Sequence, residues 1–130
     1  MTAGKYLYSD LTEKIIGAAY AVHNSLGKGL SEKTYENALV VKLKLLGLTI
    51  EQQKSLPIFF EDQKVGEQIT DLVVEEKVIV ETKTVKHVIK DHETQLLGYL
   101  KNTKLQVGLI INFSSRVEIK RLILTEQNKS

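Results

Sequence analysis

The segment VGLIINF, residues 107–113, is the feature that most constrains how this chain folds. It is almost entirely apolar and has the length of a single β-strand. A strand of this composition suits the interior of a sheet that is covered on both faces. The segment therefore predicts a sheet that lies between layers of helices.

Apolar residues with helical spacing predict three helices. The first is expected over residues 11–26, where Gly27 ends it, and the second over residues 31–46, with Ser31 as its N-cap. Helical spacing returns over residues 88–102, directly before the apolar strand.

Strand-like segments fill the intervals between the helices. Residues 49–62 predict two short strands or one bent strand, with Pro57 at a strand start or a sheet edge. Residues 68–75 and 77–85 predict an antiparallel hairpin, and residues 118–124 predict an edge strand. The expected order is α-α-β-β-β-α-β-β, which describes an α/β fold with a mixed sheet flanked by helices.

Charged residues occur in this hairpin where apolar ones are expected. An apolar run ends in Glu81-Thr82-Lys83, and Asp71 stands before the apolar run of the neighbouring strand. Buried charges are unfavourable unless they are paired or bind a metal. Because strand side chains alternate between faces, Glu81 and Lys83 should point the same way, roughly 7 Å apart. A tight hairpin would bring Asp71 close to both.

Two acids and a lysine in this arrangement predict a site for a hard divalent cation. Mg²⁺ prefers oxygen ligands, typically one or two carboxylates, and keeps several waters; Mn²⁺ is expected to substitute for it. Lys83 would orient or deprotonate a water, or stabilise charge on a phosphate. The simpler alternative is a surface salt bridge between Glu81 and Lys83.

Several motifs in fixed order resemble one known family. Asp71, Glu81 and Lys83 resemble the signature of the PD-(D/E)xK nucleases, although Ile-Thr precedes Asp71 where the signature has a proline. The segment GLSEKTY, residues 29–35, fits the G-x-x-E-x-x-Y motif of the GxxExxY protein family, a branch of that superfamily. The resemblance covers roughly residues 10–124.

The resemblance implies a restriction-endonuclease-like core and a metal-dependent nuclease. Asp71, Glu81 and the carbonyl of Thr82 would bind Mg²⁺, and Lys83 would act on the attacking water. Glu32 would be a further acid, bound directly or through water, and is expected on the inward side of its helix near Tyr35. Alternatively, Glu32 only stabilises the helix N-terminus.

Two further elements resemble RecB-like nucleases. Gln95 and Tyr99 match a Q-x-x-x-Y element and share a helix face. Gln95 would hold the scissile phosphate, and Tyr99 could stack or donate a hydrogen bond; the alternative is an exposed Gln and a core Tyr. His23 would correspond to a metal ligand of that group, or else it is a structural histidine.

Composition limits the partners and the location. The absence of cysteine excludes disulfides and thiolate chemistry, and no apolar run approaches the ~18 residues that would span a membrane. We therefore expect one domain over residues 1–130 in the cytoplasm, with no membrane contact. The net charge of +2 divides into −3 over residues 1–82 and +5 over residues 83–130. This asymmetry suits a phosphate-binding enzyme with metal carboxylates, although solvated lysines would produce the same excess.

The sequence thus predicts a Mg²⁺-dependent nuclease that hydrolyses phosphodiester bonds in nucleic acid, with DNA as the expected substrate. A non-catalytic nucleic-acid-binding or accessory module with the same fold is the alternative. Within the enzyme class, a resolvase-like endonuclease that works as a homodimer and a RecB-like end-processing nuclease both stay open.

Overall fold

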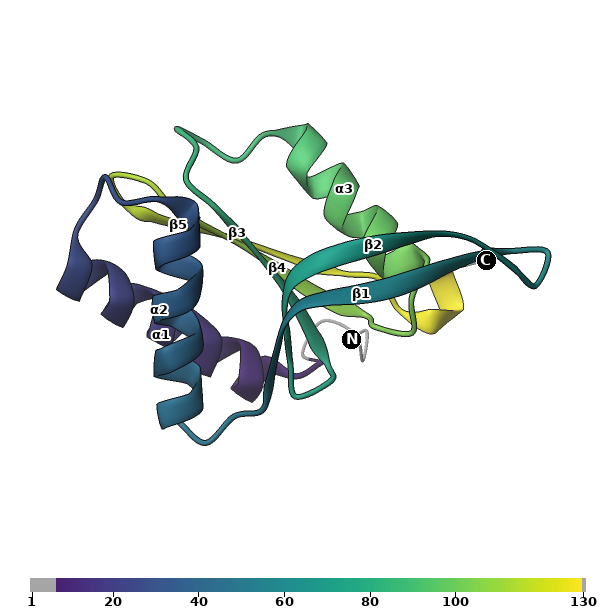
Figure 1. Ribbon diagram of the computed structural model, residues 1–130, viewed down its shortest axis with the longest axis horizontal. Helices are drawn as coiled ribbons and strands as arrows, with labels where there is room; N and C mark the ends of the chain where they lie inside the picture. Colours follow the sequence, from purple (N-terminus) through teal and green to yellow (C-terminus); the bar gives the residue numbers. More distant parts are fainter. Residues whose placement is uncertain (1–6, 130) are drawn as a thin grey trace.

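The computed structural model describes residues 7–129, and the elements follow the expected order. Two helices come first, followed by three strands, a third helix and two further strands (Figure 1). A short 3₁₀ turn ends the described chain. The bounds are α1 (Ser9–Leu26), α2 (Glu32–Leu45), β1 (Ile50–Phe60), β2 (Gln63–Val74), β3 (Val78–Lys83), α3 (Lys90–Lys101), β4 (Val107–Phe113), β5 (Val117–Ile123) and η2 (Glu126–Asn128).

The five strands form one sheet in the order β1-β2-β3-β4-β5. Strands β3 and β4 run parallel, and the other neighbours run antiparallel, so the sheet is mixed as expected. A parallel pair needs a crossover connection, which α3 supplies. All seven residues of β4 are buried, which confirms that this strand is covered on both faces.

Helices α1 and α2 cover one face of the sheet and α3 covers the other (Figure 1). Strand β3 shows the alternation directly, because Val80 packs under α1 and α2 whereas Ile79 packs under α3. Helix α3 lies close to the sheet at Gly108, where an added Cβ would come within 2.8 Å of the Leu96 side chain. Gly108 is thus the residue of β4 that admits α3 to this distance.

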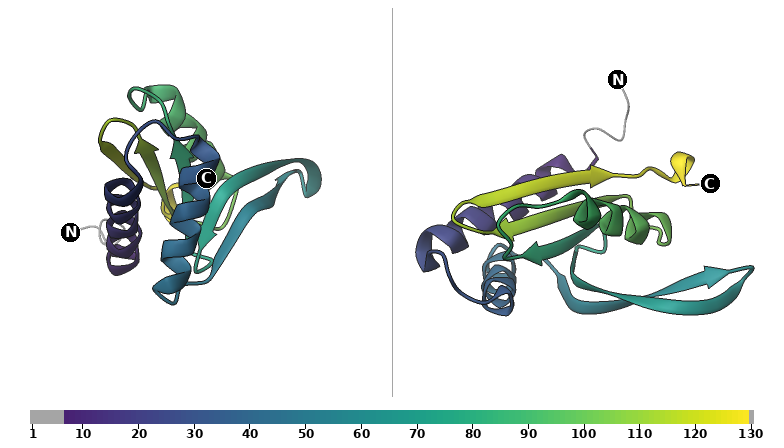
Figure 2. Two further views of the ribbon diagram at one scale, coloured as in Figure 1. Left: turned by 60° about the vertical axis from the view of Figure 1, so that its left-hand side comes forward. Right: turned by 90° about the horizontal axis from the view of Figure 1, so that it is seen from above.

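Strands β1 and β2 form a hairpin that extends beyond the rest of the sheet (Figures 1 and 2). Strand β2 pairs with β1 along almost its whole length, but with β3 only through residues 72–74. We call the two-stranded part, residues 54–70, the arm. Its tip residues Glu61 and Asp62 both have left-handed backbone angles, with φ of 51° and 61°. These angles match a type I′ hairpin turn.

The hairpin confirms one sequence expectation and differs from another. Residues 49–62 adopt the bent-strand alternative, in which Gln53 is left-handed (φ 54°) and the register shifts after Ile58. Strand β2 begins at Gln63, five residues earlier than expected, because its first half pairs with β1. Asp71 is therefore the ninth residue of β2, whereas it is the fourth residue of the expected strand.

The ends of the helices lie closer to the positions expected from the sequence. Helix α1 begins two residues earlier than expected, after a left-handed Tyr8 (φ 57°), and Gly27 follows its last residue. The Ser31 side chain accepts a hydrogen bond from the Thr34 amide at 3.2 Å and caps α2 as predicted. Pro57 lies in the edge strand β1, also as predicted. In residues 7–129, no helix is long and apolar enough to cross a membrane.

Candidate active site

The candidate site lies where β2 and β3 separate. Their ladder ends at the pair Leu72 and Val80, and the next residues on each strand are Asp71 and Glu81. The Asp71 carboxylate accepts hydrogen bonds from the Thr82 amide (2.8 Å) and the Thr82 hydroxyl (3.0 Å). The Asp71 amide donates a longer bond of 3.4 Å to Glu81 Oε1. Beyond the end of the ladder, the carboxylates of Asp71 and Glu81 thus accept hydrogen bonds from backbone amides that have no partner on the neighbouring strand.

Strand β3 holds its side of the site rigidly, because it stays paired with β4 as far as Lys83 and Asn112. Ile79 packs under α3, and alternation places Glu81 and Lys83 on that same face. Thr82 is buried on the opposite face of β3. The predicted shared orientation of Glu81 and Lys83 follows from this register.

The electrostatics of the site show that its acids are close together. Burial and then the charge of Asp71 raise the pKa of Glu81 to about 8, although the hydrogen bond from the Asp71 amide and the charge of Lys83 act in the opposite direction. Partial burial of the Glu32 carboxyl group and the charge of Asp71 also raise the pKa of Glu32. Lys83 and a backbone hydrogen bond from Thr84 oppose that rise. Four charged groups from α2, β2 and β3 therefore act on one another.

The acid on the inward side of α2 is Glu36, and the prediction that Glu32 faces inward is wrong. Glu32 is exposed overall, and the buried acid is Glu36, one helical turn later, with 2% of its surface accessible. Glu36 Oε2 accepts bonds from Lys33 (3.1 Å), Gln52 (2.6 Å) and Gln53 (3.1 Å). These donors compensate the burial of the charge.

The contacts of Glu36 connect α2 to the acids of the sheet. The left-handed Gln53 directs its amide nitrogen to both Glu36 and Asp71, the second at 3.5 Å. Non-glycine residues adopt this backbone conformation rarely, and such residues often occur near functional sites. One sequence signal could have found Glu36: it has helical spacing with the buried Leu39, Val40 and Leu43.

The two α3 residues of the Q-x-x-x-Y element lie in different environments. Tyr99 is buried, and its pKa is raised by burial and then by the charges of Glu81 and Asp71. It therefore lies within electrostatic reach of the acids. Gln95 is exposed in a shallow surface depression that it shares with His92. No contact recorded among the described residues joins Gln95 to Asp71, Glu81 or Lys83.

His23 makes structural contacts. Its Nε2 atom lies 2.8 Å from the carbonyl oxygen of Ser114, in the turn between β4 and β5. Its ring stacks beside Tyr35 and Phe113, with centroids 6.4 and 6.5 Å away. The Tyr35 hydroxyl in turn donates to the Gly27 carbonyl at 2.5 Å. Tyr35 therefore fastens the turn before α2, a physical role for the last residue of the G-x-x-E-x-x-Y motif.

A second cluster missed by the sequence analysis positions the loop after β3. Asn112 is fully buried, and its side chain forms bonds with both the amide and the carbonyl of Val85 (2.9 and 2.8 Å). Glu118 accepts from the Val88 amide at 2.9 Å and from Asn112 at 3.2 Å. The loop that leaves Lys83 is thus anchored to β4 and β5.

The donor set suits a hard cation, but it is not a complete cage. In the described part of the chain, no group of three or more His, Cys, Asp or Glu side chains is arranged to hold a metal ion. Glu32 is therefore not grouped with Asp71 and Glu81 as a third direct ligand in this arrangement, and its expected role as a ligand, bound directly or through a water, stays a prediction. Two converging carboxylates are nevertheless what Mg²⁺ commonly takes from a protein. Burial and then the charge of Asp71 raise the pKa of Glu81, and a bound cation would oppose both effects by stabilising the ionised carboxylate.

Comparison with known proteins identifies the family. A family model described as the PD-(D/E)XK nuclease superfamily matches residues 9–122. The chain belongs to the PD-(D/E)XK nuclease superfamily. Asp71, Glu81 and Lys83 all lie inside the matched region of this superfamily member. No curated protein sequence matches the chain.

A solved structure supports the same fold. The crystal structure of a protein designated SSO0001 aligns with a TM-score of 0.57 and 18% sequence identity. The alignment covers 93% of this chain and 60% of that chain, so this superfamily member spans well under the full length of SSO0001. At this identity the likeness concerns the fold.

Proposed function

We propose that this chain is a divalent-metal-dependent nuclease that hydrolyses phosphodiester bonds in nucleic acid, with DNA as its substrate. We also propose that it belongs to the GxxExxY branch of the superfamily and works as a single cytoplasmic domain over residues 1–130. Nucleases of the superfamily generally use divalent metals and act on nucleic acid. The sheet shared by both hydrophobic clusters supports the single domain.

The observation that carries the proposal is that Asp71 and Glu81 lie next to each other where β2 and β3 separate, with Glu32 and Lys83 within electrostatic reach. Asp71 and Glu81 are joined through Thr82 and the Asp71 amide, while Glu32 and Lys83 act on them electrostatically. Carboxylates that crowd into a partly buried position raise each other's pKa values, and such perturbed groups cluster at functional sites. A structural salt bridge alone does not account for three acids around one lysine.

Asp71, Glu81 and the Thr82 carbonyl would hold Mg²⁺ or Mn²⁺, with Glu32 acting directly or through a water. A bound cation would neutralise charge on the phosphate and lower the pKa of a coordinated water. The buried Glu36 keeps Gln53 beside Asp71, and the Thr82 hydrogen bonds fix the orientation of the Asp71 carboxylate.

Lys83 would act on the attacking water or on the phosphate. It lies on the same face of β3 as Glu81, and its charge lowers the pKa values of both Glu81 and Glu32. An ammonium group in this position can orient a water or stabilise the charge that develops on the phosphate. Gln95, exposed on the helix that covers this face, would hold the scissile phosphate after substrate binds.

The decisive experiment compares cleavage by the wild type and the Lys83→Met variant. The substrates are linear, circular, single-stranded and branched DNA, with RNA alongside, in Mg²⁺, Mn²⁺ or EDTA. We expect EDTA-sensitive cleavage of DNA by the wild type. Lys83→Met should bind metal and DNA but cleave roughly a hundredfold more slowly, the usual scale for losing one acid–base or electrostatic group.

Two outcomes would contradict the proposal in different ways. Unimpaired cleavage by Lys83→Met would refute the role of Lys83 while leaving the nuclease assignment in place. DNA binding by the wild type with no cleavage of any substrate would instead identify the non-catalytic accessory module. The pattern across the panel also separates endonuclease from end-processing activity, since only an endonuclease cleaves circular DNA.

A further inference from the structure

The arm, residues 54–70, exposes a set of large apolar side chains to water. Phe60 is 67% exposed and projects from a ribbon that only β1 and β2 form. A two-stranded hairpin is marginally stable in water unless something packs against it. The other exposed members of this set are Phe59 (59%), Val65 (62%) and Ile69 (59%).

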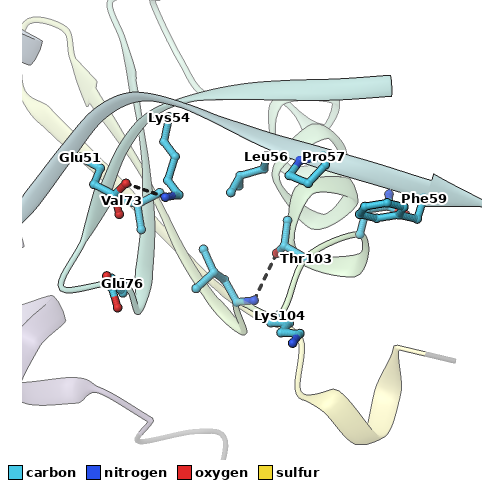
Figure 3. Close-up of a pocket in the computed structure, with 11 residues that line it drawn as sticks. Glu51, Lys54, Leu56, Pro57, Phe59, Val73, Glu76, Thr103 and Lys104 are labelled. Atoms are coloured by element: carbon cyan, nitrogen blue, oxygen red, sulfur yellow. Dashed lines mark hydrogen bonds and ion pairs between the residues drawn. The ribbon is translucent and has the colours of Figure 1, made fainter. Parts of the chain in front are cut away.

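A pocket of about 480 Å³ lies between the base of the arm and the turn that joins α3 to β4 (Figure 3). Leu56 points from β1 toward that turn, and Phe59 stands at the distal end of the pocket. Leu105 adds to the apolar lining, and Lys104 lies at the rim. The pocket is separate from the candidate active site, because none of Asp71, Glu81 and Lys83 lines it.

The charges of the arm argue against nucleic acid as its partner. The tip carries Glu61 and Asp62 beside the exposed aromatic rings. Both lysines of the arm are already paired, Lys54 with Glu51 and Lys64 with Glu67. An acidic tip repels phosphate, and anionic lipid is disfavoured for the same reason.

One part of the pocket is complementary in charge to the tip. Lys104 forms no ion pair within residues 7–129. The two acids of the lining, Glu51 and Glu76, lie on the side of the pocket away from Phe59 (Figure 3), and Glu51 is already paired with Lys54. The part of the pocket that carries Lys104 thus matches an apolar tip with Glu61 and Asp62, and every copy of the chain carries both parts. Two such copies can exchange tips around a twofold axis, which closes the assembly as a dimer.

We propose that a second copy of this chain occupies the pocket, and that the two arms clasp each other. Phe60 of each copy enters the pocket of the other, and Glu61, which follows Phe60 directly, approaches Lys104 of the second copy. The arm and residues 101–105 together supply about 22 residues, within the roughly 20–30 residues per side of a stable interface.

Direct pairing of two β1 edges is disfavoured as the alternative geometry. Pro57 lacks an amide hydrogen, and the left-handed Gln53 distorts the same edge. The contact is therefore made by side chains of the arm rather than by a continuous sheet. The proposal does not depend on the nuclease assignment.

Sedimentation equilibrium provides the first test. The wild type should be a dimer, and Phe60→Asp should weaken the dimer at least thirtyfold, as expected for an aromatic anchor in a pocket. Val41→Asp is the matched control, because Val41 is similarly exposed (60%) but lies on α2, and it should leave dimerisation unchanged. A monomeric wild type, or a dimer that Phe60→Asp leaves intact, would overturn the proposal.

Charge reversal and cross-linking test the predicted contact itself. Lys104→Glu should weaken the dimer, and adding Glu61→Lys to the same chain should restore it. Because the chain has no cysteine, Phe60→Cys and Lys104→Cys chains can be mixed and oxidised. A disulfide should form between the two variants and not within either one alone. If cross-linking is equally efficient in each single variant, or if Glu61→Lys gives no rescue, the clasp is wrong.

Discussion

Replacing Glu81 with glutamine should stabilise the metal-free protein at neutral pH. The amide has almost the same shape as the carboxyl group, and its oxygen can still accept the weak bond from the Asp71 amide. Burial and Asp71 raise the pKa of Glu81 from 4.5 to about 8 in the folded protein. Unfolding exposes the group and returns its pKa to the ordinary value.

The sign of the effect follows from where the proton is held. The folded protein keeps this proton to a higher pH than the unfolded chain, so the stabilisation is complete below pH 4.5 and is lost as the pH rises to 8. One pKa unit corresponds to 1.36 kcal/mol, so the interval from 4.5 to 7 gives about 3 kcal/mol and the interval to 8 about 5 kcal/mol. The Glu81→Gln variant has no ionisable group at this position, so its stability does not fall in this way as the pH rises.

Urea unfolding from pH 5 to pH 9 in the presence of a chelator measures the difference. The difference in free energy of unfolding between Glu81→Gln and the wild type should grow by about 2–3 kcal/mol in favour of the variant between pH 5 and pH 7. Glu13→Gln is the control, because it removes the same charge from an exposed position on α1. If Glu81→Gln and the wild type show parallel pH profiles, the burial argument is refuted.

Metal binding should offset the loss of stability that ionisation of the buried Glu81 causes. At pH 7 a group with a pKa of about 8 is mostly protonated, so binding Mn²⁺ should release close to one proton per chain. Calorimetry in two buffers of different ionisation enthalpy counts that proton. Added Mn²⁺ should raise the melting temperature of the wild type more than that of Glu81→Gln. Binding without proton release would contradict Glu81 as a ligand.

The remaining predictions concern the helices of the first layer. Glu32→Gln should remove most metal-dependent cleavage with little change in melting temperature. His23→Ala should mainly lower the melting temperature, because the variant loses the contacts of His23 with Ser114 and Tyr35. The reverse pattern would move the metal site to His23. Glu36→Gln should reduce the free energy of unfolding by about 1–3 kcal/mol, because an amide cannot accept every bond that the carboxylate accepts. It should also weaken Mn²⁺ binding severalfold in calorimetry by releasing Gln53, and unchanged affinity would limit Glu36 to a role in folding.

The general architecture could be predicted because its signals are local. Helical spacing, the Ser31 cap and the glycines after the helices depend on neighbouring residues in the chain, and they located α1, α2 and α3 within a few positions. The turn between β2 and β3 was also recognised, and both Glu75 and Glu76 adopt the left-handed angles of a tight hairpin. The apolar composition of β4 was sufficient to predict a strand covered on both faces.

The arm could not be predicted in its full length because strand pairing is not local. Residues 63–67 contain glycine and several polar side chains, so their composition does not indicate a strand. They form one because β1 lies beside them and supplies hydrogen-bond partners, as in the pair of Ile58 with Gly66. The pocket below the arm depends in addition on the turn after α3, which is far away in the sequence.

The sequence by itself determined which charged groups β2 and β3 carry, because Asp71, Glu81 and Lys83 interrupt apolar strands. Helical spacing placed Glu36 in line with the apolar residues of α2, but only the tertiary structure decided that a charge at this position is buried. A charged residue on a helix is normally assigned to the exposed face. Glu36 is buried because Gln52 and Gln53, 16 and 17 residues away along the chain, donate hydrogen bonds to it from β1. Burial of a charge depends on such distant partners, and the helix that carries the charge does not reveal them.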